Sequence, residues 1–133
     1  MEFNTMGRVI TEATIENIHD VWDAERKLIL PDQIRKLDVT DALVEPREHF
    51  LSIPTRYIGL LGLNWVAETG MYEPVRLTIM GRSCTMDVME ESNTGSVVIG
   101  NIPLTHLDFV VDLRDRKLIG NPAHGGEHVY EMY

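Results

Sequence analysis

Short segments in which apolar and polar residues alternate follow one another along most of this chain, with turn residues between them. This period of two is typical of half-buried β-strands. It predicts a hairpin over residues 72–90 and a second one in which 109–111 and 117–119 flank the turn Asp112 to Arg116. Further strands are expected at 9–18, 34–39, 42–44 and 97–99. Because strand follows strand without intervening helices, the pattern predicts a mostly-β barrel or sandwich.

A single segment has clear helical character. Pro54 suits a first helical turn, and apolar residues at 58, 60, 61 and 63 supply an apolar face. Ser52 is expected to cap the start and Gly62 to end the helix. We therefore expect one short helix near 54–62, and a loop with at most a helical turn over 19–33.

The composition limits environment and partners. With 133 residues, 44% hydrophobic and 25% charged, the chain has the proportions of one globular domain. Its formal net charge of −9 opposes binding to phosphates, so no nucleic-acid partner is expected. No apolar run approaches the ~20 residues of a membrane span, and no membrane association is expected. A single cysteine, Cys84, excludes an internal disulfide and fits the cytoplasm.

The first residues have a separate interpretation. Met1 to Thr5 precede a second methionine, Met6, and read as a vector-derived leader, with 6–133 forming a single domain.

Several segments taken together resemble a known family. In order they are Ala42-Leu43-Val44, Leu51-Ser52-Ile53-Pro54, Leu61-Gly62-Leu63, Val98-Ile99-Gly100, and a short helix with Leu104 and Leu107 that leads into Asp108 to Asp112. This order is similar to that of the bacterial relatives of the retroviral aspartic proteases, the retropepsin-like family. The resemblance covers nearly all of 6–133 and implies a closed antiparallel β-barrel that forms a homodimer, with no cofactor.

In that family an Asp-Thr-Gly loop follows the hydrophobic strand, and two chains bring their Asp carboxylates together to share a proton and activate water. Here the corresponding residues are Glu45-Pro46-Arg47. Glu45 extends the carboxylate by one methylene, on a scale where about 1 Å matters. Pro46 removes a hydroxyl and a backbone donor, and Arg47 replaces the glycine that permits a tight turn. We expect ordinary aspartic protease chemistry to be lost.

The roles of individual residues stay open at this stage. Glu45 is either a surviving catalytic carboxylate or a surface glutamate that is solvated or paired with arginine, and Arg47 either clamps Glu45 or Glu48 of a partner chain or is solvated. Candidate groove and loop residues are Arg47, Glu48, His49, Trp65 and Tyr72. The aromatic pair would line a peptide groove or simply pack.

Three functions follow from these features. The first is a non-catalytic, peptide-binding or regulatory dimer, in which an extended peptide pairs as an added strand beneath the 72–90 hairpin. The second is a peptidase that uses Glu45 in place of the family aspartate. The third is a metal-binding protein that uses Glu45, Glu48 and His49, with His124 or His128.

Overall fold

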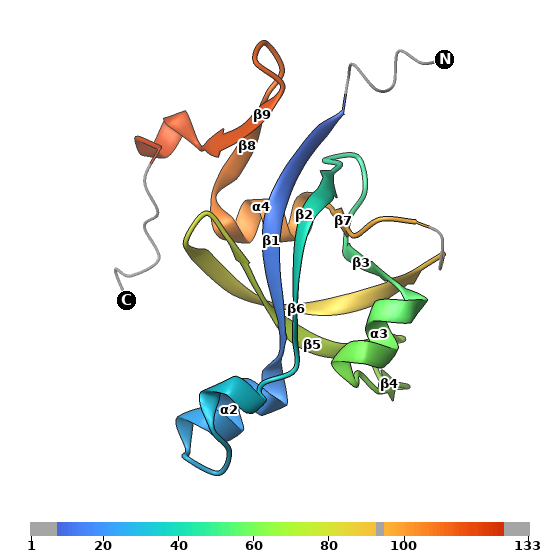
Figure 1. Ribbon diagram of the computed structural model, residues 1–133. Helices are drawn as coiled ribbons and strands as arrows, with labels where there is room; N and C mark the ends of the chain where they lie inside the picture. The colour runs from blue at the N-terminus through green and yellow to red at the C-terminus, as the bar shows by residue number, and fades with distance from the viewer. Residues whose placement is uncertain (1–7, 93–94, 127–133) are drawn as a thin grey trace.

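The computed structural model describes residues 8–92 and 95–126 (Figure 1). The strands are β1 (Val9–Asn17), β2 (Lys36–Val44), β3 (Leu51–Pro54), β4 (Trp65–Val66), β5 (Met71–Ile79), β6 (Arg82–Glu91), β7 (Val98–Ile99), β8 (Phe109–Asp112) and β9 (Lys117–Gly120). The helices are α2 (Ile18–Glu25), α3 (Thr55–Leu61) and α4 (Asn101–Leu107), with 3-10 turns η1 (Pro31–Gln33) and η2 (Pro122–His124).

Six of the strands close into a barrel. Their order is β1-β2-β7-β3-β6-β5, and β5 pairs back to β1, while β4 pairs with the first residues of β5. The predicted mostly-β barrel is confirmed. So are the hairpins: Val75 faces Met86 in β5–β6, and Val110 faces Ile119 in β8–β9.

The barrel is mostly antiparallel, as expected, but two of its strand pairs are parallel. Strand β7 runs parallel to β2, with Leu43 opposite Val98, and β3 runs parallel to β6, with Leu51 opposite Val88. The strands of each parallel pair are far apart in the sequence, so no hairpin turn joins them.

The helices also differ in part from the prediction. The helix at 54–62 is confirmed as α3, and it ends at Gly62, whose φ of 68° is the left-handed conformation that favours glycine. Ser52 does not cap it, because that residue lies in β3 and the cap position belongs to Pro54. Two further helices are present: α4, at the place where the resemblance implies a short helix, and α2, where at most a helical turn was expected.

Helix α2 projects from the end of the barrel where β1 passes into β2 (Figure 1). The Asn17 side chain caps it by accepting a hydrogen bond from the amide of Asp20. Asp20 in turn accepts two bonds from the Arg35 guanidinium, at 2.8 and 3.1 Å, and one from the Arg35 amide. These contacts fasten both ends of the projection to the barrel.

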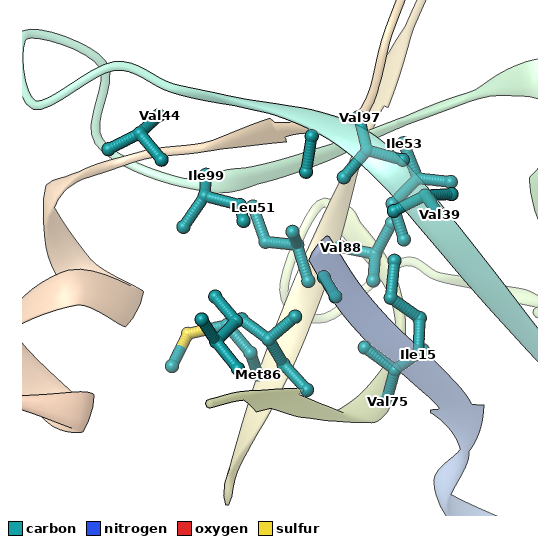
Figure 2. Close-up of a cluster of buried hydrophobic side chains, with 14 of the residues drawn as sticks. Ile15, Val39, Val44, Leu51, Ile53, Val75, Met86, Val88, Val97 and Ile99 are labelled. Carbon is teal, nitrogen blue, oxygen red and sulfur yellow. The ribbon is translucent and has the colours of Figure 1, made fainter. Parts of the chain in front are cut away.

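The core fills the barrel interior (Figure 2). Fully buried residues from five of the strands meet there: Ile15, Leu51, Ile53, Val75, Leu77, Val88 and Ile99. Leu61 of α3 and Leu107 of α4 close it from outside. The alternation seen in the sequence therefore marks the inward face of each strand correctly. The terminal segment 129–133, predicted as an interface strand, lies outside the described residues.

Candidate functional site

The segment that the resemblance aligns with Asp-Thr-Gly lies in the 45–50 loop between β2 and β3. It is fastened to the junction of β7 and α4 by backbone hydrogen bonds. The amide of Glu45 donates to the carbonyl of Ile99 at 2.9 Å, and the amide of Gly100 donates to the carbonyl of Phe50 at 3.0 Å. The first amides of α4 donate to the carbonyls of Glu48 and His49. The loop thus supplies acceptors for donors that a helix start leaves unsatisfied.

Close approach of the two segments depends on Gly100. A Cβ placed there would lie 2.6 Å from the Phe50 carbonyl oxygen and 2.7 Å from the His49 carbonyl carbon. The φ of Gly100 is −87°, which any residue adopts. Glycine is therefore needed here because a side chain would not fit, and not for its backbone conformation.

Glu45 and Arg47 form an ion pair within this loop. Arg47 Nε donates to Glu45 Oε2 and Arg47 Nη2 to Glu45 Oε1, both at 2.9 Å, so one guanidinium engages both carboxylate oxygens. The pKa of Glu45 is held below its ordinary value, chiefly by these side-chain hydrogen bonds and despite partial burial. A carboxylate held in this way is a poor proton donor near neutral pH.

The two partners differ in exposure. The Glu45 side chain is 23% exposed, whereas that of Arg47 is 88% exposed. Of the two interpretations of Glu45, the geometry favours the arginine-paired group. Arg47 clamps Glu45 of its own chain.

The other loop residues surround this pair. Glu48 contributes an additional negative charge near Arg47, which with Glu45 raises the pKa of the guanidinium. His49 lies edge-on to Phe50, with ring centroids 6.0 Å apart. Phe50 and Ile102, on the two sides of the loop–helix junction, are 39% and 37% exposed. The junction therefore presents both charge and apolar surface.

Trp65 and Tyr72 form a separate patch on β4 and β5. They are cross-strand partners whose rings meet edge to face at 5.2 Å. The Tyr72 hydroxyl donates to Glu90 at 3.1 Å, and this bond raises the pKa of the tyrosine. The structure brings the two aromatic residues together, and their contacts are with each other and with Glu90 rather than with Glu45 or Arg47.

The histidine and carboxylate side chains proposed as metal ligands are dispersed. His124 pairs with Asp108 at the far end of α4, at 2.7 Å between Nδ1 and Oδ1. Within residues 8–92 and 95–126, no three histidine, cysteine or acidic side chains come together as a metal site would need. His128 lies outside the described residues.

A polar cluster at the end of α4 escaped the sequence analysis. Asp108 caps the helix in the left-handed conformation, and its side chain is only 9% exposed. Arg82 donates to the carbonyls of Leu107, Asp108 and Gly126 and lies over the Phe109 ring. The signal available was weak, since Asp108 follows a short helix that looked like a single turn.

Two further residues behave as the sequence indicated. Burial raises the pKa of Cys84 to about 12, so its thiol is not a nucleophile at neutral pH. The Asp112 side chain accepts hydrogen bonds from the amides of Arg114 and Asp115 and shapes the β8–β9 turn.

Comparisons with known proteins assign no family to this chain. Within the described residues, no helix has both the length and the apolar character to cross a membrane. No protein-family model matches the chain, and a search of curated proteins returns no match either.

Proposed function

We propose that this protein is a degenerate relative of the retropepsin-like proteases that binds extended peptides without cleaving them. The observation that carries the proposal is the Glu45–Arg47 pair. Proton sharing between two carboxylates requires that one of them stays protonated. Here both oxygens of Glu45 are taken by a cation of the same chain, and its pKa is lowered.

The barrel and the loop support the resemblance at the level of architecture. The resemblance implies a closed barrel, which the structure has, and in this barrel the loop after β2 is bonded to the start of the short helix after β7. Peptide binding needs backbone donors and acceptors and side-chain pockets, and these do not depend on a catalytic aspartate.

A homodimer is part of the proposal. The resemblance implies pairing through the 45–50 loops, and the exposed Phe50 and Ile102 beside the loop give this region apolar surface. Arg47 of each copy would already be neutralised by Glu45, which removes the charge crowding that a pair of such loops would otherwise create. Light scattering at micromolar concentration should report twice the chain mass, and a monomer there would contradict this part.

Labelled, heat-denatured casein tests the function. Fluorescence anisotropy at neutral pH should show saturable binding, and gel electrophoresis after incubation from pH 3 to 8 should show intact casein. The Glu45→Gln variant should behave as the parent does in both assays. Cleavage by the parent that Glu45→Gln abolishes would overturn the proposal in favour of a glutamate-dependent peptidase. Failure to bind casein or any denatured protein would remove the peptide-binding part.

Restoring the family turn is a complementary test. The combined change Glu45→Asp, Pro46→Thr and Arg47→Gly should introduce proteolysis if only this turn has been disabled.

A further inference from the structure

The segment from Asn121 to Gly126 follows β9, which pairs with β8 in a two-stranded sheet beside the barrel (Figure 1). Two side chains attach this segment to the rest of the fold. Arg82 of β6 donates from Nη2 to the Gly126 carbonyl at 2.6 Å. Asp108, at the end of α4, bonds through Oδ1 to His124 Nδ1 at 2.7 Å and to Asn121 Nδ2 at 3.3 Å.

Only the second attachment changes its charge near neutral pH. A guanidinium stays protonated throughout, whereas an imidazole gains or loses a proton between about pH 5 and 8. The His124 side chain is 51% exposed, so it exchanges protons directly with water. Because an ionised carboxylate can only accept, Nδ1 carries the hydrogen of this contact in both charge states of the ring. Deprotonation therefore keeps the hydrogen bond but removes its charge assistance, which is about half of its strength.

The surroundings of Asp108 make that loss consequential. Its side chain is only 9% exposed, and its second oxygen, Oδ2, is buried with no hydrogen-bond partner among the described residues. An ionised oxygen removed from water in this way costs free energy unless a nearby charge compensates. The pKa of Asp108 is lowered, chiefly by the His124 hydrogen bond, so the carboxylate stays ionised while the imidazole titrates. When His124 is neutral, the closed segment holds a buried anion against an uncharged partner.

The charges nearby do not replace the imidazolium. Arg82 also acts on Asp108, but its Nη1 donates to two backbone carbonyls at the end of α4 and not to the carboxylate. His106, in the last turn of α4, is exposed. Phe109 of β8, which lies against the guanidinium, carries no charge. His124 is thus the titratable side chain that bonds to the carboxylate.

Two glycines at the end of the segment give it a place to bend. Gly125 and Gly126 have φ of 75° and 76°, in the left-handed region that favours glycine. A Cβ at either position would meet no atom within 4 Å, so packing does not hold them in this conformation. Glycine also has the widest choice of other conformations, which lets the segment leave the closed one.

We propose that the His124–Asp108 contact is a pH-sensitive switch that holds the segment from Asn121 to Gly126 against α4. Imidazolium facing carboxylate favours the closed segment at pH 5, and this advantage is lost as the pH rises to 8. The segment then opens more often, while Arg82 still attaches Gly126. The switch goes beyond the proposed function and does not rest on it.

Amide hydrogen exchange, followed by NMR, measures the opening. The Asn121 amide donates to the Asp108 carbonyl at 2.9 Å, so it is protected only while the segment is closed. After correction for base-catalysed exchange, its protection should fall by about twofold to fivefold between pH 5 and 8, the range for a partly solvated ion pair. The Leu77 amide in the barrel core serves as the reference for global unfolding. Constant protection of Asn121 over this range would overturn the inference.

Two variants form a matched pair, because each removes one imidazole near the end of α4. His124→Gln keeps a neutral donor but cannot titrate, so the protection of Asn121 should no longer depend on pH. His106→Gln should keep the pH dependence of the parent. A pH dependence that persists in His124→Gln, or that His106→Gln abolishes, would overturn the inference.

The carboxyl group of Asp108 gives a second measurement that does not depend on exchange. Carbon-13 NMR should show that His124→Gln raises the pKa of Asp108, because the group that chiefly lowers it is gone, whereas His106→Gln leaves it as in the parent. An unchanged Asp108 pKa in His124→Gln would show that the two side chains do not interact in solution and would overturn the inference.

Discussion

Gly100 offers a direct test of how tightly the 45–50 loop is fastened to α4. In Gly100→Ala the new Cβ would lie 2.6 Å from the Phe50 carbonyl oxygen, about 0.8 Å short of the 3.4 Å at which ordinary contact begins. The neighbours are backbone atoms held by their own hydrogen bonds, so they yield only if the loop shifts. Inserting one carbon into such a packed place costs about 1–3 kcal/mol.

Gly59→Ala is the matched control, because both variants add one methyl group. Gly59 lies on the exposed side of α3 with no atom within 4 Å of the new Cβ, so alanine there should stabilise the protein by about 0.5–1 kcal/mol. Urea unfolding followed by circular dichroism should place the midpoint of Gly100→Ala about 0.5–1.5 M below the parent and that of Gly59→Ala slightly above it. Equal midpoints for the two variants would refute the claim that the loop and α4 are packed in close backbone contact.

Three further predictions concern stability and reactivity. Asp20→Asn should lower the free energy of unfolding by about 1–3 kcal/mol at pH 7. Because Arg35 lowers the pKa of Asp20, this contribution is present above the unfolded pKa of about 4 and is lost as the pH falls through the folded pKa. Urea midpoints of parent and variant should therefore approach each other as the solution is acidified, and a constant difference would contradict the assignment. Arg82→Leu should cost about 2–4 kcal/mol by urea unfolding, since three backbone carbonyls lose their donor, and a loss under about 0.5 kcal/mol would exclude that role. Cys84 should react with a disulfide reagent at pH 8 at least about a hundredfold more slowly in the native protein than in urea, because its pKa of about 12 leaves little thiolate; equal rates would show that the thiol is accessible and ionisable.

The regular parts of the fold were predictable because their signals are local. The β5–β6 hairpin follows from alternation on both sides of a Gly81 turn, and α3 from a proline start and a glycine end. Each needs only neighbouring residues to specify it.

The structural features that the sequence analysis did not predict all depend on contacts between residues far apart in the chain. Helix α2 is polar in sequence, with His19, Asp20 and Asp23, and it is held by Asn17 and by Arg35 on the far side of the projection. One parallel pair joins β2 to β7, which has only two residues and fits between β2 and β3, and the other joins β3 to β6. No local pattern specifies such pairings.

The candidate site likewise combines features that neighbouring residues specify with features that depend on how the chain folds. Glu45 and Arg47 lie two residues apart, so the sequence alone was enough to single them out as a candidate pair. That Arg47 pairs within its own chain depends on how the loop folds back.

The ionisation of Glu45 is the most direct test of the account. Carbon-13 NMR of the glutamate carboxyl groups, followed from pH 2 to 8, should show Glu45 titrating in a single step below its ordinary value, and Arg47→Gln should move that step upward. A Glu45 pKa above the ordinary value, or two coupled steps of the kind expected for carboxylates that share a proton, would contradict the claim that this loop has lost its acid–base chemistry.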